Sequence, residues 1–233
     1  MRDLTFGRDL ASRKNAFTRF YLAIVKILHA FRYYDARNKR YASLIWEFVG
    51  SSLGQGRVVV DLGCGPGGMT SLLRGVHQLI GVDLDRYYLL RFVDPAIPRI
   101  QARAECLPFK DGRVGVIVAV SLVEHVADQV GLFRELARAL ESGGRLVLQF
   151  PELRFPIEPH TKWPLLHLWK PALQARILAA TGYADLNMSV SLAHVVRDAE
   201  AAGFRVDQTM LLWHFKLARI VRQPMGYFVL LRR

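Results

Sequence analysis

The segment VVVDLGCGPGGMT, residues 58–70, places an acid directly before a glycine-rich turn. The β-branched residues before Asp61 are typical of a buried strand, and the glycines let the backbone turn sharply and let a ligand approach the main chain. The carboxylate of Asp61 would repel a pyrophosphate placed on this turn, whereas it would attract an ammonium group. The pattern therefore favours a ligand with a positively charged group over a dinucleotide.

A second acid, Asp83, ends the next buried run, QLIGVDLD. It stands where folds of this kind hydrogen-bond the hydroxyls of a ribose, a sugar that several cofactors share. Gly63, Gly65 and Gly68 also fit the G-x-G-x-x-G pattern of dinucleotide-binding turns, although that match alone is weak. A dehydrogenase therefore stays as an alternative, which NAD binding would support.

Four further side chains are candidates for acting on a second substrate. Glu124 and His125 follow a buried run, and Glu158 and His160 lie in the segment PIEPHT. An imidazole that titrates near neutral pH can take a proton from a hydroxyl or phenol. The alternatives are structural: His125 bonded to a neighbouring loop, and Glu158 and His160 bracing their own loop. Catalytic roles for His125, His160 and Glu158 are the hypothesis to be tested.

The two cysteines, Cys64 and Cys106, give no disulfide framework and no metal-ligand spacing. We expect free thiols and no metal site.

Alternating strands and helices are needed to position these residues. Strands are predicted near residues 57–61, 78–82, 98–101, 114–120 and 144–150, and helices near 67–75, 85–92 and 127–141. This alternation predicts an α/β fold with a doubly wound, mostly parallel sheet, in which ligands bind beyond the carboxyl ends of the strands. Each candidate residue named so far stands at or after the end of a predicted strand, or lies in the cap described next.

The flanks of this core differ from it. After residue 150 the chain is rich in proline, which predicts a cap insertion over about residues 151–190. Helices are predicted over 171–181, within this cap, and over 191–202. Trp163, Trp169, Trp213 and Phe155 either wall an acceptor pocket there or belong to the core. Residues 17–31 predict a basic amphipathic helix, either a lid over the cofactor or a helix in a membrane interface. A second helix over 33–50 completes the N-terminal region, 1–50, before a domain at 51–233.

Four segments resemble motifs of the class I S-adenosylmethionine-dependent methyltransferases. They are DLGCGPGG, GVDLD, RAECLPFKDGRVGVIVAVSLVEHV and LESGGRLVLQFPE. The chain is similar to the methyltransferase type 11 group, which includes quinone-biosynthesis methyltransferases. The resemblance implies a Rossmann-like sheet of seven strands whose final strand is antiparallel and inserted beside the fifth. It also implies S-adenosyl-L-methionine as the cofactor and S-adenosyl-L-homocysteine as the product.

The same resemblance implies a set of cofactor-binding residues. They are Asp61, Gly63, Cys64, Gly65, Gly67, Asp83, Leu84, Ala104, Glu105 and Ser121. One position departs from the family pattern, because Arg103 stands where many relatives carry an acid that accepts the adenine amino group. A guanidinium has no acceptor, so we expect adenine to use backbone near Ala104, the side chain of Glu105 or apolar walls such as Leu84 and Leu107.

The formal net charge of +12 is unevenly distributed. Residues 1–40 carry 10 Lys and Arg against 3 Asp and Glu (+7), residues 41–150 carry 11 against 11 (zero), and residues 151–233 carry 11 against 6 (+5). The basic flanks favour an acidic partner such as an anionic membrane surface, a phosphorylated carrier or nucleic acid.

Methyl transfer to a small apolar, glycan or lipid-linked acceptor, on oxygen or carbon, is therefore the function we expect. An RNA methyltransferase and a non-catalytic S-adenosylmethionine-binding protein are the alternatives. Because no apolar run is long enough for a bilayer span and no secretory leader begins the chain, we expect a cytoplasmic protein with peripheral membrane contact. The sequence leaves the oligomeric state open.

Overall fold

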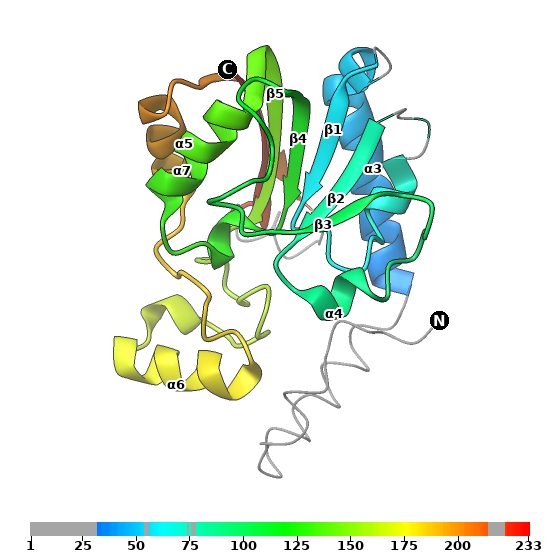
Figure 1. The fold of residues 1–233 in the computed structure, drawn as a ribbon. Helices are drawn as coiled ribbons and strands as arrows, with labels where there is room; N and C mark the ends of the chain where they lie inside the picture. The colour runs from blue at the N-terminus through cyan, green and yellow to red at the C-terminus, as the bar shows by residue number, and fades with distance from the viewer. Residues whose placement is uncertain (1–31, 54–55, 74, 76–77, 214–221) are drawn as a thin grey trace.

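Figure 1 shows the computed structural model, which describes residues 32–53, 56–73, 75, 78–213 and 222–233. The predicted basic helix over 17–31 lies outside the described residues.

A seven-stranded sheet forms the centre of the fold, with the strand order β3-β2-β1-β4-β5-β7-β6 (Figure 1). Its strands are β1 (Val58–Leu62), β2 (Gln78–Asp83), β3 (Arg99–Gln101), β4 (Val114–Val120), β5 (Leu140–Pro151), β6 (Arg205–Leu212) and β7 (Gly226–Arg232). The first five strands are parallel, and β7 runs antiparallel between β5 and β6. The predicted doubly wound α/β fold, including the inserted final strand, is confirmed.

The register of the central strands gathers the motifs at one edge of the sheet. Leu62, the last residue of β1, pairs with Val82 of β2 on one side and with Ala119 of β4 on the other. The turn that starts at Gly63, the acid Asp83 and the end of β4 therefore lie next to one another. β4 is buried on both faces, as expected for a central parallel strand.

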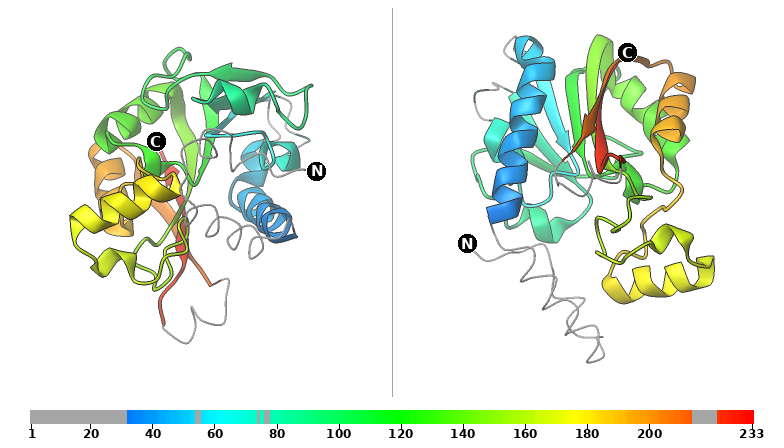
Figure 2. Two further views of the ribbon diagram at one scale, coloured as in Figure 1. Left: turned by 90° about the horizontal axis from the view of Figure 1, so that it is seen from below. Right: turned by 180° about the vertical axis from the view of Figure 1, so that it is seen from behind.

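Helices cover both faces of the sheet (Figures 1 and 2). On one face lie α3 (Arg32–Leu53), the short 3₁₀ helix η1 (Thr70–Leu73) and α4 (Arg86–Leu89), and on the other lie α5 (Gln129–Ala139) and α7 (Leu192–Ala201). Three further elements lie beyond the carboxyl ends of the parallel strands: η2 (Val123–His125), η3 (Leu166–Leu168) and α6 (Pro171–Thr181). The last two belong to the predicted cap.

The helix α3 is a layer of the core. Tyr41, Ile45 and Phe48 on its inner face are buried, and the rings of Tyr41 and Phe48 stand edge-to-face on Phe228 at centroid distances of 5.0 and 6.1 Å. The division predicted at residue 50 falls inside this helix, so the second half of the predicted N-terminal region packs directly on the sheet.

Two elements differ from their predicted form. Where a helix was predicted over 67–75, the described residues form turns and then η1, because Gly67 and Gly75 take positive φ angles that an α-helix does not use. The fifth strand begins at Leu140, earlier than predicted, and is irregular where its pairing with β4 shifts near Val114. None of the described helices has the length and apolar character needed to cross a membrane.

Candidate active site

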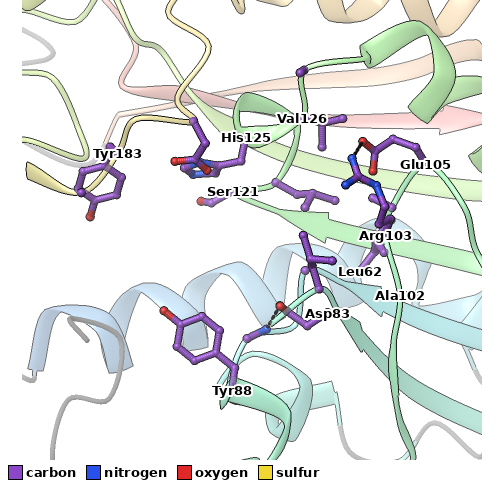
Figure 3. Close-up of a pocket in the computed structure, with 18 of the residues that line it drawn as sticks. Leu62, Asp83, Tyr88, Ala102, Arg103, Glu105, Ser121, His125, Val126 and Tyr183 are labelled. Atoms are coloured by element: carbon purple, nitrogen blue, oxygen red, sulfur yellow. Dashed lines mark hydrogen bonds and ion pairs between the residues drawn. The ribbon is translucent and has the colours of Figure 1, made fainter. Parts of the chain in front are cut away.

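A cavity of about 550 Å³ opens at the carboxyl edge of the sheet, between the strand ends and the cap (Figure 3). The described residues that line it are Leu62, Gly63, Gly65, Asp83, Leu84, Tyr88, Ala102, Arg103, Ala104, Glu105, Ser121, Leu122, His125, Val126, Ala127, Thr181, Gly182, Tyr183 and Asp185. Figure 3 shows Asp83 and the Arg103–Glu105 pair near one end and His125 and Tyr183 near the other. We call these the cofactor end and the acceptor end.

At the cofactor end, the glycine turn is tied to β2. The backbone N–H groups of Gly63 and Cys64 both donate to the carbonyl of Val82, at 2.8 and 3.1 Å. The N–H of Gly65 donates to Oδ2 of Asp83 at 2.7 Å, and that of Asp85 donates to Oδ1 at 2.8 Å. Burial raises the pKa of Asp83, against these hydrogen bonds. Because each carboxylate oxygen has a second lone pair, Asp83 can still accept hydrogen bonds from a ribose.

Gly65 lines the cavity with open space where a side chain would stand. Its φ is +52°, which disfavours other residues, and a Cβ added to it would meet no atom within 4 Å. By contrast, a Cβ on Gly67 would lie 2.6 Å from the ring of Phe92. Gly67 is therefore needed for packing behind the turn. Cys64 also lies behind it, with a buried thiol whose pKa is raised chiefly by burial.

Asp61 lies beneath the turn and does not line the cavity. Its side chain is 2% exposed, and its Oδ2 accepts a hydrogen bond of 2.5 Å from the hydroxyl of Thr70. Burial raises the pKa of Asp61 to about 6; the charge of Asp83 adds to the rise and the Thr70 hydroxyl opposes it. The contact with a cofactor ammonium stays a prediction, and the placement implies that any such attraction acts from below the turn.

The loop after β3 supplies the wall predicted for adenine. Ala104 and Glu105 line the cavity, and Arg103 turns its guanidinium to Oε1 of Glu105 at 2.8 Å. The positive charge of Arg103 is therefore balanced by the carboxylate of Glu105. Glu105 remains the acidic side chain of this loop that reaches the cavity.

Arg138 on α5 holds the rest of this loop in place. Its guanidinium donates to both carboxylate oxygens of Glu135 at 2.8 and 2.7 Å, and to the carbonyls of Phe109 and Leu107 at 2.8 and 3.2 Å. It also pairs with Asp111 at 2.5 Å. Arg138 therefore couples the position of the loop to the helix on the outer face of the sheet.

Ser121 follows β4 directly and lines the cavity near His125 (Figure 3). Its φ of 53° is unusual for a residue other than glycine, and conformations of this kind cost about 1–3 kcal/mol. Its backbone N–H and its hydroxyl both donate to Gln149 on β5, at 2.8 and 3.1 Å. These two bonds hold the strained residue in the wall of the cavity.

At the acceptor end, His125 lines the cavity beside Asp185. The Nδ1 of His125 lies 2.9 Å from Oδ2 of Asp185, a residue 60 positions later in the chain. Since a carboxylate only accepts hydrogen bonds, Nδ1 carries a proton in this pair and Nε2 is the nitrogen left for another partner. The hydrogen bond with His125 lowers the pKa of Asp185.

His160 and Glu158 lie behind His125 and do not line the cavity. Glu158 is fully buried; its carboxylate accepts from the backbone of His160 at 3.0 Å and of Thr161 at 2.5 Å, and Oε1 lies 2.9 Å from Nδ1 of His160. The predicted brace of this loop is therefore present.

Charge pairing dominates over burial at this brace. Burial opposes the charge of His160, but Glu124 and Glu158 raise its pKa to about 9. Burial also opposes ionisation of Glu158, and contact with His160 lowers its pKa to about 2. The ring of His160 meets that of His125 edge-to-face, with centroids 5.2 Å apart. The loop brace thus stands against the acceptor end.

The cavity brings together eight of the predicted site residues and leaves five outside. Gly63, Gly65, Asp83, Leu84, Ala104, Glu105, Ser121 and His125 line it, whereas Asp61, Cys64, Gly67, Glu158 and His160 support it from behind. The roles assigned to these residues stay predictions.

Sequence reasoning missed Asp185 and Tyr183, which line the acceptor end. They lie in the segment ATGYADLNM, where no spacing or periodicity distinguishes them from other loop residues. The four predicted aromatic residues are placed elsewhere: Phe155 is buried, Trp163 packs edge-to-face on Trp169 at 6.0 Å, and neither these nor Trp213 are among the described lining residues.

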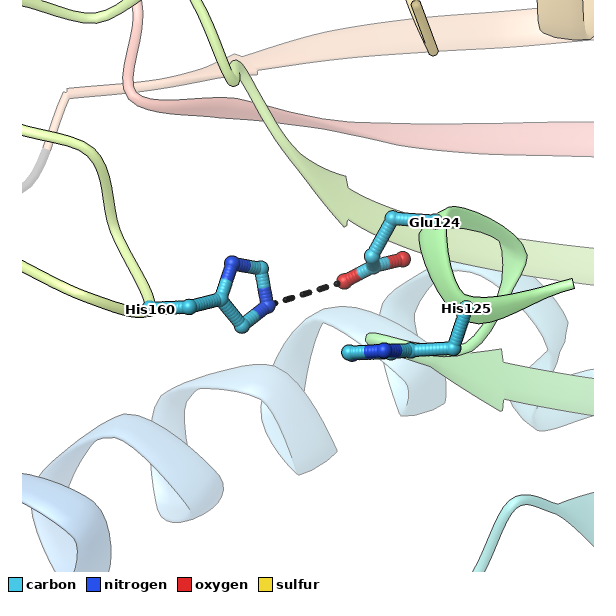
Figure 4. A group of neighbouring side chains, drawn as sticks. All are labelled: Glu124, His125 and His160. Carbon is cyan, nitrogen blue, oxygen red and sulfur yellow. Dashed lines mark ion pairs between the residues drawn. The ribbon is translucent and has the colours of Figure 1, made fainter. Parts of the chain in front are cut away.

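The absence of a metal site was expected from the spacing of the cysteines alone. Ligand atoms of Glu124, His125 and His160 nevertheless lie within 4.8 Å of one another (Figure 4). Because His160 comes from the cap and the other two from η2, no local motif in the sequence reveals this cluster.

Comparison with known proteins shows that the core of the chain is similar to a methyltransferase domain. Residues 60–148 match the family model of a methyltransferase domain. A probable S-adenosylmethionine-dependent methyltransferase of Mycobacterium tuberculosis is 31% identical over 166 residues, which cover 66% of this chain and 60% of that protein. A trans-aconitate 2-methyltransferase of Agrobacterium fabrum is 32% identical over 96 residues, 40% of this chain and 38% of that protein. The chain thus spans about 60% or less of the length of these relatives.

Solved structures show the same fold. An S-adenosylmethionine-dependent methyltransferase from Mesorhizobium loti superposes with a TM-score of 0.63 at 20% identity, covering 81% of this chain and 97% of that one. The geranyl diphosphate C-methyltransferase of Streptomyces coelicolor, solved with Mg²⁺, geranyl diphosphate and S-adenosyl-L-homocysteine, superposes with a TM-score of 0.60 at 18% identity, covering 82% and 77%.

Proposed function

We propose that this chain, whose residues 60–148 match the family model of a methyltransferase domain, transfers the methyl group of S-adenosylmethionine to a hydroxyl oxygen of a small acceptor. The acceptor would be an uncharged molecule, either apolar, a glycan or lipid-linked. The observation that carries the proposal is the His125–Asp185 pair, which stands at the end of the cavity opposite Asp83.

The two ends of the cavity suit the two substrates of this reaction. Asp83 and the turn at Gly65 offer a carboxylate and open backbone to the ribose and methionine parts of the cofactor. His125 offers Nε2 to the acceptor, because Asp185 occupies Nδ1. Transfer from a sulfonium is a displacement with a good leaving group, so holding the acceptor oxygen in line with the methyl supplies much of the rate.

A hydroxyl acceptor also needs to lose a proton. His125 is the side chain that we propose to activate the oxygen, and Asp185 holds its ring in the required tautomer. A carbon acceptor would use the same placement but would lose its proton after the new bond forms. We favour oxygen because the imidazole faces the cavity where the acceptor would enter.

The charges around the cavity argue against a nucleic-acid acceptor. Among the described lining residues, three carboxylates, Asp83, Glu105 and Asp185, outnumber the guanidinium of Arg103, which is itself paired with Glu105. A phosphate backbone would be repelled by this set. This supports a small neutral acceptor over RNA.

The experiment is a methyl-transfer assay on a panel of phenols, sugars and prenyl alcohols, with trans-aconitate as a carboxylate comparator. S-adenosyl-L-homocysteine and the methylated product are both counted by mass spectrometry. We expect turnover on a hydroxyl acceptor that falls about 10²–10⁴-fold in His125→Ala. His194→Ala, outside the cavity, serves as the control. Full activity of His125→Ala would contradict the assigned role, and no product with any acceptor would contradict the activity.

We also propose that the basic N-terminal region brings the protein to anionic membranes. The support is its charge, +7 over residues 1–40. The test is sedimentation of the full chain with vesicles containing phosphatidylglycerol, beside an Arg13→Gln, Lys14→Gln double variant. Sedimentation that is absent, or unchanged in the variant, would contradict the proposal.

A further inference from the structure

Three side chains at the acceptor end converge on one point. Glu124 and His125 project from η2, and His160 reaches them from the loop after β5 (Figure 4). One ligand atom from each lies within 4.8 Å of the other two. The cluster therefore brings possible ligand atoms from two parts of the chain together.

Glu124 is the informative member of this cluster. Its side chain is 0% exposed, and neither of its carboxylate oxygens has a hydrogen-bond partner among the described residues. A buried carboxylate without such partners is costly, and native structures rarely keep one. Its Oε1 points to Nε2 of His160 (Figure 4).

The distance between these two atoms suits two ligands of one ion. Oε1 of Glu124 and Nε2 of His160 are 3.6 Å apart, longer than a normal hydrogen bond. Ligands at about 2.0–2.1 Å from a tetrahedral ion are roughly 3.4 Å from each other. The spacing is therefore close to that of a coordination edge.

Both imidazoles are already oriented as metal ligands are. Nδ1 of His125 faces the carboxylate of Asp185, and Nδ1 of His160 faces that of Glu158, each at 2.9 Å. Ligating histidines almost always donate their other ring nitrogen to a carboxylate or carbonyl, which fixes the tautomer and leaves Nε2 for the ion. Two independent carboxylates thus orient the two imidazoles and leave Nε2 of each for another partner.

We propose that Glu124, His125 and His160 bind a divalent transition-metal ion, with Zn²⁺ as the best match. Two imidazoles and one carboxylate suit Zn²⁺ and its neighbours, whereas Mg²⁺ and Ca²⁺ prefer oxygen ligands. Three protein ligands leave an open coordination position, as in catalytic zinc sites.

An ion here would act on the acceptor, a role that rests on the proposed function. Because His125 lines the cavity, the open position would meet the acceptor hydroxyl. The ion would lower the pKa of that hydroxyl, whose proton passes to solvent water in the cavity. The oxygen lone pair then forms the bond to the methyl carbon, while the electrons of the breaking carbon–sulfur bond stay on sulfur and give S-adenosyl-L-homocysteine. His125 then activates the oxygen through the ion.

The competing occupant is a proton. An imidazolium at His160 would pair with both Glu124 and Glu158 without any ion, and the two occupants exclude each other at Nε2. Measuring metal binding directly separates them.

The test is equilibrium dialysis of tag-free, full-length protein, first stripped with EDTA, against Zn²⁺, with bound metal counted by mass spectrometry. We expect one Zn²⁺ per chain and no displacement by millimolar Mg²⁺. Affinity should fall at least 100-fold in Glu124→Gln, which keeps the shape of the side chain, and in His160→Ala. His194→Ala should bind like the wild type, because its ring contacts the carbonyl of Ser189 and is not one of the three clustered ligands.

Calorimetry with S-adenosyl-L-homocysteine accompanies each variant and shows that the fold and the cofactor end are intact. A wild type without stoichiometric Zn²⁺ would overturn the proposal, as would equal affinity in Glu124→Gln. Zinc binding without methyl transfer to any acceptor would leave the site standing and overturn the proposed function. Methyl transfer by a chain that binds no Zn²⁺ would support the proposed function and overturn the metal site.

Discussion

The cofactor end and the acceptor end of the cavity differ in how the chain builds them. At the cofactor end, neighbouring parallel strands deliver Asp83 and the glycine turn to the same edge, and backbone N–H groups make most of the contacts. At the acceptor end, η2 meets the cap through ionisable side chains, with partners as far as 60 residues apart. Local sequence therefore determines the first end, and tertiary contacts determine the second.

The consequence is that the two ends should fail separately. A change at the cofactor end should weaken S-adenosyl-L-homocysteine binding and spare the cluster of Glu124, His125 and His160. A change in that cluster should disturb the cluster and spare S-adenosyl-L-homocysteine binding.

The largest effect should come from Asp83→Ala. The change removes the acceptor of the Gly65 and Asp85 amides and of the predicted ribose contact. Hydrogen bonds to a charged group contribute about 1.5–3 kcal/mol each, so we expect about 100-fold weaker binding of S-adenosyl-L-homocysteine in calorimetry.

Asp85→Ala is the matched control for this change. It removes a carboxylate two residues away that caps α4 through the N–H of Tyr87 and does not line the cavity. Equal losses in both variants would show that the effect is local unfolding and would undo the separation of the two ends.

Arg138→Ala tests whether the adenine loop belongs to the cofactor end. The change releases Glu135, Asp111 and two loop carbonyls, so the free energy of unfolding should fall by about 2 kcal/mol. Cofactor affinity should fall about fivefold, because Ala104 and Glu105 lose their support. Urea unfolding and calorimetry measure the two effects. Arg134→Ala, exposed on the same helix, should change neither, and unchanged affinity in Arg138→Ala would place the loop outside this end.

Asp61→Asn gives a smaller effect that depends on pH. The folded pKa of Asp61, about 6, lies above its unfolded value, so the folded state binds the proton more tightly. The stability that Asp61 contributes therefore rises as pH falls through 6 toward 4, and it is lowest at neutral pH. Asp61→Asn should be about 1 kcal/mol more stable than the wild type at pH 7, after the weaker Thr70 hydrogen bond is counted, and this gain should vanish near pH 4.

Thermal or urea unfolding across this pH range measures the effect. Cofactor affinity in the same variant should fall at least about tenfold if the carboxylate attracts the ammonium from below the turn. A variant that binds the cofactor normally would leave Asp61 with a structural role only.

The last prediction concerns the reactivity of the cysteines and involves no change in cofactor affinity. Cys106 is exposed, whereas Cys64 is buried behind the turn and its pKa is raised. Iodoacetamide should modify one thiol per chain, and Cys64 should react at least about 100-fold more slowly than Cys106. Mass spectrometry of the wild type and Cys106→Ser decides this. Rapid modification of Cys64 in the variant would show that the turn opens to solvent.

Sequence reasoning located the parallel strands along the chain because, apart from the short and exposed β3, they are mainly buried runs rich in apolar residues. It placed Asp83, Gly65, Ala104 and His125 at the cavity, since all follow strand ends or lie in the motif after β3. It did not separate residues that face the cavity from those behind the turn, because Gly67 and Cys64 are distinguished only by their contacts with Phe92 and Gly81.

Sequence reasoning did not predict the contacts at the acceptor end, for a different reason. Asp185 and His160 contact η2 only after the cap has folded back over the sheet, and no periodicity in the sequence predicts these contacts. The burial of Glu124 likewise depends on tertiary packing that the local sequence does not predict. The helix expected over 67–75 was wrong because glycine φ angles outweighed the helical spacing of its neighbours.

The most direct test of the two-ended cavity is a crystal structure with S-adenosyl-L-homocysteine bound. We predict that the ribose hydroxyls contact Asp83, that adenine lies between Leu84 and the loop at Ala104, and that sulfur points toward His125. An adenosine that occupies the space beside His125 and Tyr183, or a ligand that leaves Asp83 untouched, would contradict the account.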